Sequence, residues 1–311
     1  CRRRGASKMA TSSSSSWTNV LSIVNHPRNR RVRYRGAPSR CFWVDDKHPM
    51  RGVHSVIDTL YLPFAKSQLP RRLPRDVRAG NARNRHCVGN SPLDHGVNVD
   101  RDMDVYVELC VRAGCRIADA DWHRAVLQKH NRCCDPCSRR LVAFLRRRHW
   151  LPLRTQQVIF DHKLRLATAI DLLCIDTRTH DAVVIELKTT FHASHEYYER
   201  DSADGAHLCH VQPPTAYSYV NADLLQLYLT MVMLRRNYCR DGATVRGYLV
   251  RVPSQGSIAT YDVSSDWFAA VDANLVPLLS TGNVIATAKR RRRASTNQRG
   301  GKRRRATSDA V

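Results

Sequence analysis

The stretch from Thr168 to Thr190, TAIDLLCIDTRTHDAVVIELKTT, decides the fold of this chain. Apolar runs rich in Val, Ile and Leu occupy Leu164–Leu173 and Ala182–Thr189, and each predicts a β-strand. The polar residues Asp176–Asp181 lie between the two runs and predict a turn. The whole stretch therefore predicts a β-hairpin inside an apolar sheet.

Three charged residues interrupt these apolar strands. Glu186 and Lys188 are two positions apart on the second strand, so their side chains share one face. The hairpin brings Asp171 of the first strand beside them. Burying two carboxylates in an apolar setting costs free energy unless a cation compensates their charge. Mg²⁺ suits such a site, since it takes carboxylate oxygens and keeps waters and substrate phosphates as further ligands. The trio therefore predicts a metal-dependent site that acts on phosphodiesters, where Lys188 orients or deprotonates a water or stabilises the pentavalent intermediate.

The simpler interpretation of an acid-x-Lys pattern is a solvated strand face with a cross-strand ion pair. Three features of this sequence weigh against it. The residues flanking Glu186 and Lys188 are apolar, a second acid lies at hairpin distance, and the chain is strongly basic.

The pattern around the hairpin predicts alternating helices and strands. A helical pattern covers the residues from Val99 to Trp150, with a break at Cys133–Cys137 where Pro136 is expected to end a helix. The remaining predicted elements are a strand at Gln157–Phe160, a helix at Ala222–Arg236, strands at Thr244–Val252 and Ser257–Val263, and a helix at Ser265–Leu279. This order predicts an α/β (α+β) fold, a mixed central β-sheet flanked by helices.

Net charge points to a polyanionic partner. The 311 residues carry a formal charge of +24, of which residues 1–44 contribute +10 and residues 289–311 contribute +9. Nucleic acid and anionic membranes are the partners that such charge favours. No apolar run in the sequence reaches the length of a membrane span, so we expect DNA rather than a membrane as the partner.

The composition also suggests how the chain is divided. Residues 1–16 are Arg- and Ser-rich and are expected to be a disordered leader, with Met9 as a candidate natural start or the segment a transit peptide. Residues 17–95 give no clear pattern and are assigned to the periphery of the domain. We expect the catalytic core at 96–282 and a disordered basic tail at 283–311. Eleven cysteines without a secretory signal are interpreted as mostly reduced thiols of an intracellular protein.

At this point the residues resemble a known family, the PD-(D/E)xK nuclease superfamily in its RecB-like branch. Within that branch the mitochondrial genome maintenance exonucleases look most similar. Their pattern, a strand ending in Asp followed by apolar-apolar-(D/E)-x-K-T, matches Thr168–Asp171 and Val184–Thr189. The resemblance covers roughly residues 96–280 and implies a restriction-endonuclease-like core.

The chain departs from the family at three positions. The family's Q-x-x-x-Y helix matches at Gln226 but has Thr230 in place of Tyr. Ile170 replaces the Pro of the superfamily name, which this branch allows. The upstream G-x-x-x-H motif finds its best match at Gly96–Asp100, with Asp in the position of the metal-binding His.

The resemblance implies hydrolysis of DNA with Mg²⁺ or Mn²⁺. Asp171 and Glu186 would be metal ligands, with the carbonyl of Leu187 as a further ligand and Asp100 in the place of the family's His. Lys188 would be the catalytic lysine. Gln226 would support the active site or the substrate.

Other residues are weaker candidates. The arginines of two basic clusters, Arg146, Arg147 and Arg148 in a helix and Arg290 and Arg291 in the tail, are candidates for phosphate contacts. The tail clusters at 289–293 and 302–305 also resemble a bipartite nuclear localisation signal. Cys133, Cys134 and Cys137 lack the second Cys/His pair that a zinc site needs. The iron–sulfur cluster of some RecB-like nucleases needs three downstream cysteines, whereas only Cys239 follows the predicted helix that carries Gln226. His192 and His195 are expected in a solvated loop, with contact to DNA or support of the metal as the alternative.

Three hypotheses remain open from the sequence. The first is a Mg²⁺-dependent DNA nuclease, an exonuclease by its resemblance, acting in replication, repair, recombination or DNA processing. The second is a non-catalytic nucleic-acid-binding or packaging protein with a nuclease-like fold. The third is a nuclease that acts only with replication or recombination proteins. The tail clusters favour the nucleus, with the mitochondrion as the alternative.

Overall fold

The computed structural model describes residues 20–35, 41–62, 92–112, 135–190, 207–208, 218–239, 244–253, 256–262 and 265–281. Within them, the chain forms a mixed α/β fold around an eight-stranded sheet. The strands of this sheet are β1 (Val32–Arg35), β2 (Cys41–Val44), β3 (His48–Gly52), β5 (Trp150–Asp161), β6 (Leu166–Asp176), β7 (Ala182–Thr190), β9 (Val245–Pro253) and β10 (Ala259–Asp262). The helices are α2 (Val53–Leu60), α4 (Pro92–Arg112), α6 (Pro136–Arg148), α8 (Tyr219–Asn237) and α9 (Ser265–Ser280), with a 3₁₀ turn at Pro27–Arg30 and a small separate sheet of β4 (Tyr61–Leu62) and β8 (His207–Leu208).

The sheet is built on the predicted hairpin. β6 and β7 pair antiparallel around the turn at 176–181, and β5 pairs antiparallel with the other edge of β6. β9 runs parallel to β7, and β10 returns antiparallel to β9. Strands β6 and β7 are buried along most of their length, as their runs of Val, Ile and Leu require.

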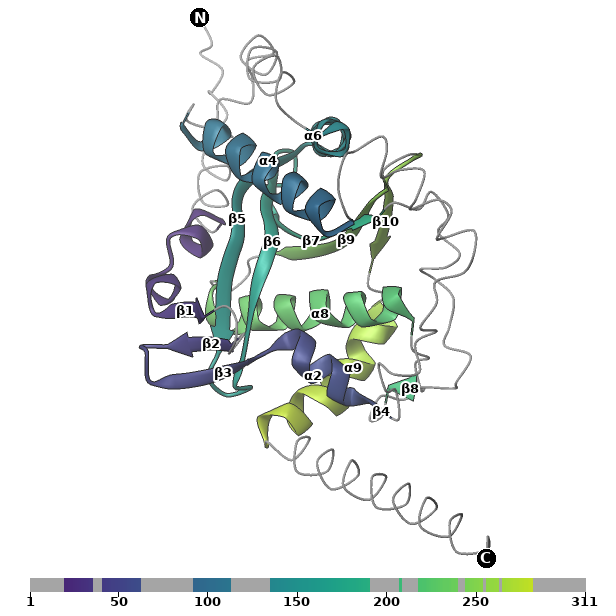
Figure 1. Ribbon diagram of the computed structural model, residues 1–311. Helices are drawn as coiled ribbons and strands as arrows, with labels where there is room; N and C mark the ends of the chain where they lie inside the picture. Colours follow the sequence, from purple (N-terminus) through teal and green to yellow (C-terminus); the bar gives the residue numbers. More distant parts are fainter. Residues whose placement is uncertain are drawn as a thin grey trace, which may run out of the picture.

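Helices cover both faces of these strands. Figure 1 shows α4 and α6 on one side of β5, β6 and β7, and α8 and α2 on the other. A large hydrophobic core joins the sheet to α2, α4, α6, α8 and α9, so one continuous apolar interior supports the molecule. None of the described helices combines the length and apolar character needed to cross a bilayer.

Both ends of α6 are set by capping residues, and its C-terminal end differs from the prediction. Pro136 is the first residue of α6, where Asp135 caps the helix by accepting a hydrogen bond from the Cys137 N–H at 2.8 Å. The predicted helix end before Pro136 falls on residues 113–134, which lie outside the described residues. At the other end, His149 adopts a left-handed conformation with φ 59° and closes α6. Trp150, predicted to be helical, is therefore the first residue of β5, which is longer than the predicted strand at Gln157–Phe160.

The segment before residue 63 contributes to the main sheet. β1, β2 and β3 form an antiparallel meander, and β3 then pairs parallel with the start of β6 through Arg51 and Gly52. The β2–β3 turn is tight, since Asp45 and Asp46 both have positive φ, near 52° and 55°. The predicted leader at 1–16 and tail at 283–311 lie outside the described residues.

Candidate active site

A fork in the sheet creates the cleft that holds the predicted residues. β7 pairs with β6 over Leu172–Ile175, whereas β3 pairs with the same edge of β6 at Leu166 and Ala167. The cleft opens between these two pairings and has a volume of about 780 Å³. Its lining comes from β1, β2, β5, β6, β7, the β3–α2 junction, α4 and α8, and includes Asp100, Asp171, Glu186, Leu187, Lys188 and Gln226. The structure thus brings all six predicted core-site residues to one cavity.

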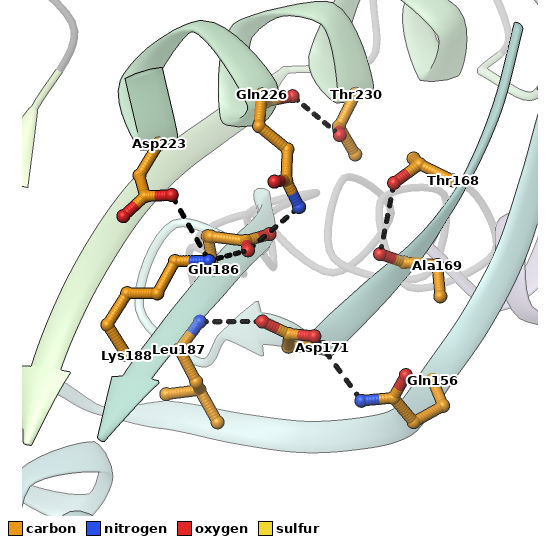
Figure 2. A network of polar contacts seen from close by, with 10 residues as sticks. All are labelled: Gln156, Thr168, Ala169, Asp171, Glu186, Leu187, Lys188, Asp223, Gln226 and Thr230. Carbon is orange, nitrogen blue, oxygen red and sulfur yellow. Dashed lines mark hydrogen bonds and ion pairs between the residues drawn. The ribbon is translucent and has the colours of Figure 1, made fainter. Parts of the chain in front are cut away.

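Asp171 is held where the two strands separate. Its Oδ2 accepts a hydrogen bond from the Leu187 N–H at 2.9 Å, and its Oδ1 accepts one from the Gln156 side-chain amide at 3.3 Å. Gln156 lies on β5 with φ 46°, in the left-handed region that non-glycine residues rarely adopt. Backbone strain of this kind persists only where the surrounding structure imposes it. Such strained residues often occur at functional sites. Here the unusual backbone accompanies a Gln156 side chain directed at Asp171 (Figure 2).

Glu186 and Lys188 form a buried network with α8. Lys188 Nζ lies 2.8 Å from Glu186 Oε1 and 3.2 Å from Asp223 Oδ1. Gln226 Nε2 donates to the same Glu186 oxygen at 2.8 Å. Figure 2 shows these contacts bridging β7 and the first turns of α8, which begins at Tyr219 behind the capping hydroxyl of Ser218.

Burial changes the protonation of these acids. Burial, followed by the nearby Asp171 carboxylate, raises the pKa of Glu186 to about 8, although Lys188 opposes the shift. Burial also raises the pKa of Asp171 against the lowering effects of Lys188 and the Leu187 N–H. Burial alone would lower the pKa of Lys188, but Glu186 and Asp223 more than offset it, so its pKa is raised and the side chain is an ammonium ion at neutral pH.

Asp100 approaches the cleft from α4. Gly96 lies one helical turn before it, and a Cβ atom on Gly96 would lie 3.2 Å from Thr189 Oγ1, so glycine permits the close approach of α4 to β7. The pKa of Asp100 is raised to about 6 by desolvation and then by Asp171 and Asp104. Its side chain keeps contact with solvent at the edge of the cleft. Asp100 therefore lies within electrostatic reach of Asp171.

The side chains available as ligands in the cleft decide whether it can bind a metal ion. Among the described residues, no group of three or more His, Cys, Asp and Glu side chains is arranged to hold an ion, so the chain offers no closed metal cage there. Mg²⁺ does not need one, because it is commonly held by one or two carboxylates with water and substrate phosphates. When ionised, Asp171, Glu186 and Asp223 carry three negative charges against the one positive charge of Lys188, which leaves the excess that a divalent cation neutralises. The residues therefore fit a hard divalent ion in an open site.

Gln226 has a buried side-chain oxygen, Oε1, without a hydrogen-bond donor among the described residues. A buried acceptor of this kind is costly unless water or a ligand supplies a donor. Thr230, in the position of the family's Tyr, does not supply it, since its hydroxyl donates to the Gln226 backbone carbonyl at 2.8 Å.

The remaining candidates are elsewhere. Arg146, Arg147 and Arg148 are exposed at the end of α6 and do not line the cleft. Cys137 is buried in the first turn of α6, with its Sγ 3.4 Å from the Pro253 carbonyl, so it is not exposed for a metal. Arg290, Arg291, His192, His195, Cys133 and Cys134 lie outside the described residues.

Two residues of the site are absent from the sequence prediction. Asp223 was detectable in principle, since it lies three residues before Gln226 on the same face of α8. Gln156 was not, because its approach to Asp171 depends on a positive φ that no sequence pattern indicates.

Comparison of the chain with family models, curated proteins and solved structures gives no match. Function is therefore inferred from the geometry of the cleft.

Proposed function

We propose that this protein is a DNA nuclease that hydrolyses phosphodiester bonds with Mg²⁺ or Mn²⁺. The observation that carries the proposal is the convergence of Asp171, Glu186 and Lys188 where β7 separates from β6, inside one open cleft. Buried acids with raised pKa values beside a lysine, in a cavity, are typical of functional sites.

Each residue has a defined role in the proposed reaction. Asp171 and Glu186 would hold the ion, with Asp100 and the Leu187 carbonyl as further candidate donors. When bound there, the ion would polarise the phosphodiester and lower the pKa of a water ligand. Lys188 is an ammonium ion held by Glu186 and Asp223, so it would stabilise negative charge on the phosphate oxygens rather than accept a proton. The free Oε1 of Gln226 would accept a hydrogen bond from the attacking water.

The arrangement also favours a restriction-endonuclease-like core of the RecB-like type. The order from α6 through β5, β6, β7 and α8 to β9 places the acidic hairpin before the helix that carries Gln226. The parallel strand β9 then extends the sheet beyond β7. This is the order that the family resemblance implies.

Cleavage of labelled single- and double-stranded DNA in Mg²⁺, Mn²⁺ or EDTA tests the proposal. We expect cleavage that requires the ion and that falls at least about a hundredfold in Asp171→Asn and in Lys188→Gln. Asp181→Asn is a matched control, because Asp181 pairs with Arg246 at 2.6 Å at the far end of β7 and does not line the cleft.

The second candidate is a packaging protein that binds DNA without cutting it. The strong positive charge of the chain favours this function as well. Binding without metal-dependent cleavage would favour the packaging protein and reject the nuclease. Cleavage that is unchanged in Asp171→Asn would reject the proposed active site.

A further inference from the structure

An aromatic pair lies in the wall of the cleft formed by the N-terminal strands. Tyr34 on β1 and Phe42 on β2 both line the same cavity as Asp171 and Glu186. They are directly opposite each other in the antiparallel pair, and their ring centroids are 5.0 Å apart with a tilt of 48°. The two rings therefore form one continuous aromatic surface.

This surface continues a buried apolar face into the cleft. Val32, Val44 and Met50 occupy the same face of the meander and are buried against β5 and β6. Tyr34 is at the outer end of that face and is 53% exposed, whereas Phe42 is half-buried. Gly52 lies next to Phe42, where a Cβ atom would come within 3.8 Å of the ring. The absent side chain leaves that part of the ring open.

Aromatic side chains in a nucleic-acid cleft bind bases by stacking, which is tolerant of sequence because every base has a flat face. Bases inside a duplex are already stacked on each other, so only unpaired bases can use such a surface. A cleft of about 780 Å³ is within the range, roughly 300–1,000 Å³, of pockets that enclose small-molecule ligands.

We infer that Tyr34 and Phe42 form a stacking site for unpaired bases of single-stranded DNA. This site lies in the part of the cleft wall formed by β1 and β2, in the same cavity as the acidic residues. The inference rests on the proposed function for its substrate, since the strand bound here would present its backbone to Asp171 and Glu186. It deepens that function by assigning Tyr34 and Phe42 as the residues that contact the bases of the bound strand.

The alternative is that the pair only stabilises the meander, as cross-strand aromatic pairs commonly do. The two interpretations differ in what they require of the ligand. If the pair stacks on bases, affinity depends on the presence of bases on the strand. If the pair is only structural, affinity is the same with and without bases.

The experiment measures binding in EDTA, without cleavage, by fluorescence anisotropy. The probes are a short oligothymidine, the same backbone with abasic sites, and a duplex of equal length. The unaltered protein should bind the oligothymidine more tightly than either other probe. Tyr34→Ala should weaken oligothymidine binding roughly 5- to 150-fold, the range for removal of one stacked base, and leave abasic binding unchanged. Tyr34→Phe should restore the preference for bases.

Arg33→Ala is the matched control, because Arg33 is the neighbouring residue on β1, points to the opposite face and is 73% exposed. It should leave the ratio between oligothymidine and abasic binding unchanged. Equal binding of the oligothymidine and abasic probes by the unaltered protein, or equal weakening of both by Tyr34→Ala, would overturn the inference. The binding assay needs no cleavage, so it is independent of the proposed nuclease activity. A protein that does not cleave DNA but still binds oligothymidine more tightly than the abasic strand would contradict the nuclease proposal and support the stacking site.

Discussion

The position of Lys188 depends on two carboxylates on different elements. Glu186 is on the same strand, and Asp223 reaches the ammonium from α8 at 3.2 Å. Removing the charge of Asp223 in Asp223→Asn leaves Lys188 with one ionic partner and frees it to rotate. We expect kcat for DNA cleavage to fall roughly ten- to a hundredfold, as for supporting residues of metal sites.

DNA affinity in EDTA separates this effect from a structural one. Asp223 acts through Lys188 rather than on the substrate, so binding should be unchanged while kcat falls. A variant in which affinity and kcat fall together, or in which neither changes, would show that Asp223 does not position Lys188.

Gln156 couples backbone strain to the position of Asp171. Its φ of 46° costs about 1 kcal/mol for a side chain, and glycine removes that cost. Gln156→Gly should therefore raise the free energy of unfolding by about 1 kcal/mol in urea denaturation while lowering cleavage, because the variant cannot donate the hydrogen bond to Asp171. Arg165→Gly, at φ 54° in the β5–β6 turn, should give a similar gain in stability with unchanged cleavage. Unchanged cleavage in Gln156→Gly would mean that the strain serves no catalytic purpose.

The site residues differ in how far the sequence could predict them. Asp171, Glu186 and Lys188 are within one hairpin, where strand alternation and a short turn fix their relative positions. Gln226 depended on a family resemblance, since forty residues separate it from Glu186. Gln156 required knowledge of a backbone angle, which residue type alone does not determine.

Elements were predictable where their apolar pattern was long. The hairpin strands β6 and β7 and the helix α8 were placed correctly to within a few residues. The α6–β5 boundary was wrong, because a histidine at position 149 does not indicate the left-handed backbone that separates helix from strand there. Strands β1 to β3 were missed because they are short and lie among many Arg, Pro and Asn residues, which hide the apolar alternation of a strand.

The packing of α8 on β9 offers a test at the level of elements. Gly247 on β9 lies beneath α8, where a Cβ atom would lie 3.1 Å from Leu227 Cγ and would collide with Met231 Sδ. Gly247→Ala should therefore lower the free energy of unfolding by about 1–3 kcal/mol in urea denaturation, the usual cost of overpacking. Gly52→Ala is the control, with its nearest contact at an ordinary 3.8 Å, and should change stability by less than about 0.5 kcal/mol. Equal stability of the two variants would mean that α8 does not approach β9 as closely as described.

At the scale of the whole molecule, most of the positive charge lies in other segments of the sequence than the residues that line the cleft. The cleft is rich in acids, whereas residues 289–311 alone carry ten Lys and Arg against one acid. If the protein acts on DNA, the tail would supply affinity and the cleft would supply cleavage. Each phosphate that the tail neutralises would add about 0.9 to the slope of log affinity against log salt concentration.

Removal of residues 283–311 tests this division. Binding to DNA in EDTA should weaken, and the magnitude of the salt slope should fall by about 0.9 for each phosphate that the tail had neutralised. The cleavage rate at saturating DNA should be unchanged, because Asp171, Glu186 and Lys188 are retained. A milder variant with Arg303, Arg304 and Arg305 replaced by Gln should reduce the slope in proportion to the charges removed. A slope unchanged by both alterations would place the DNA-binding surface on the folded body instead, where the exposed Arg146, Arg147 and Arg148 would be the first residues to replace.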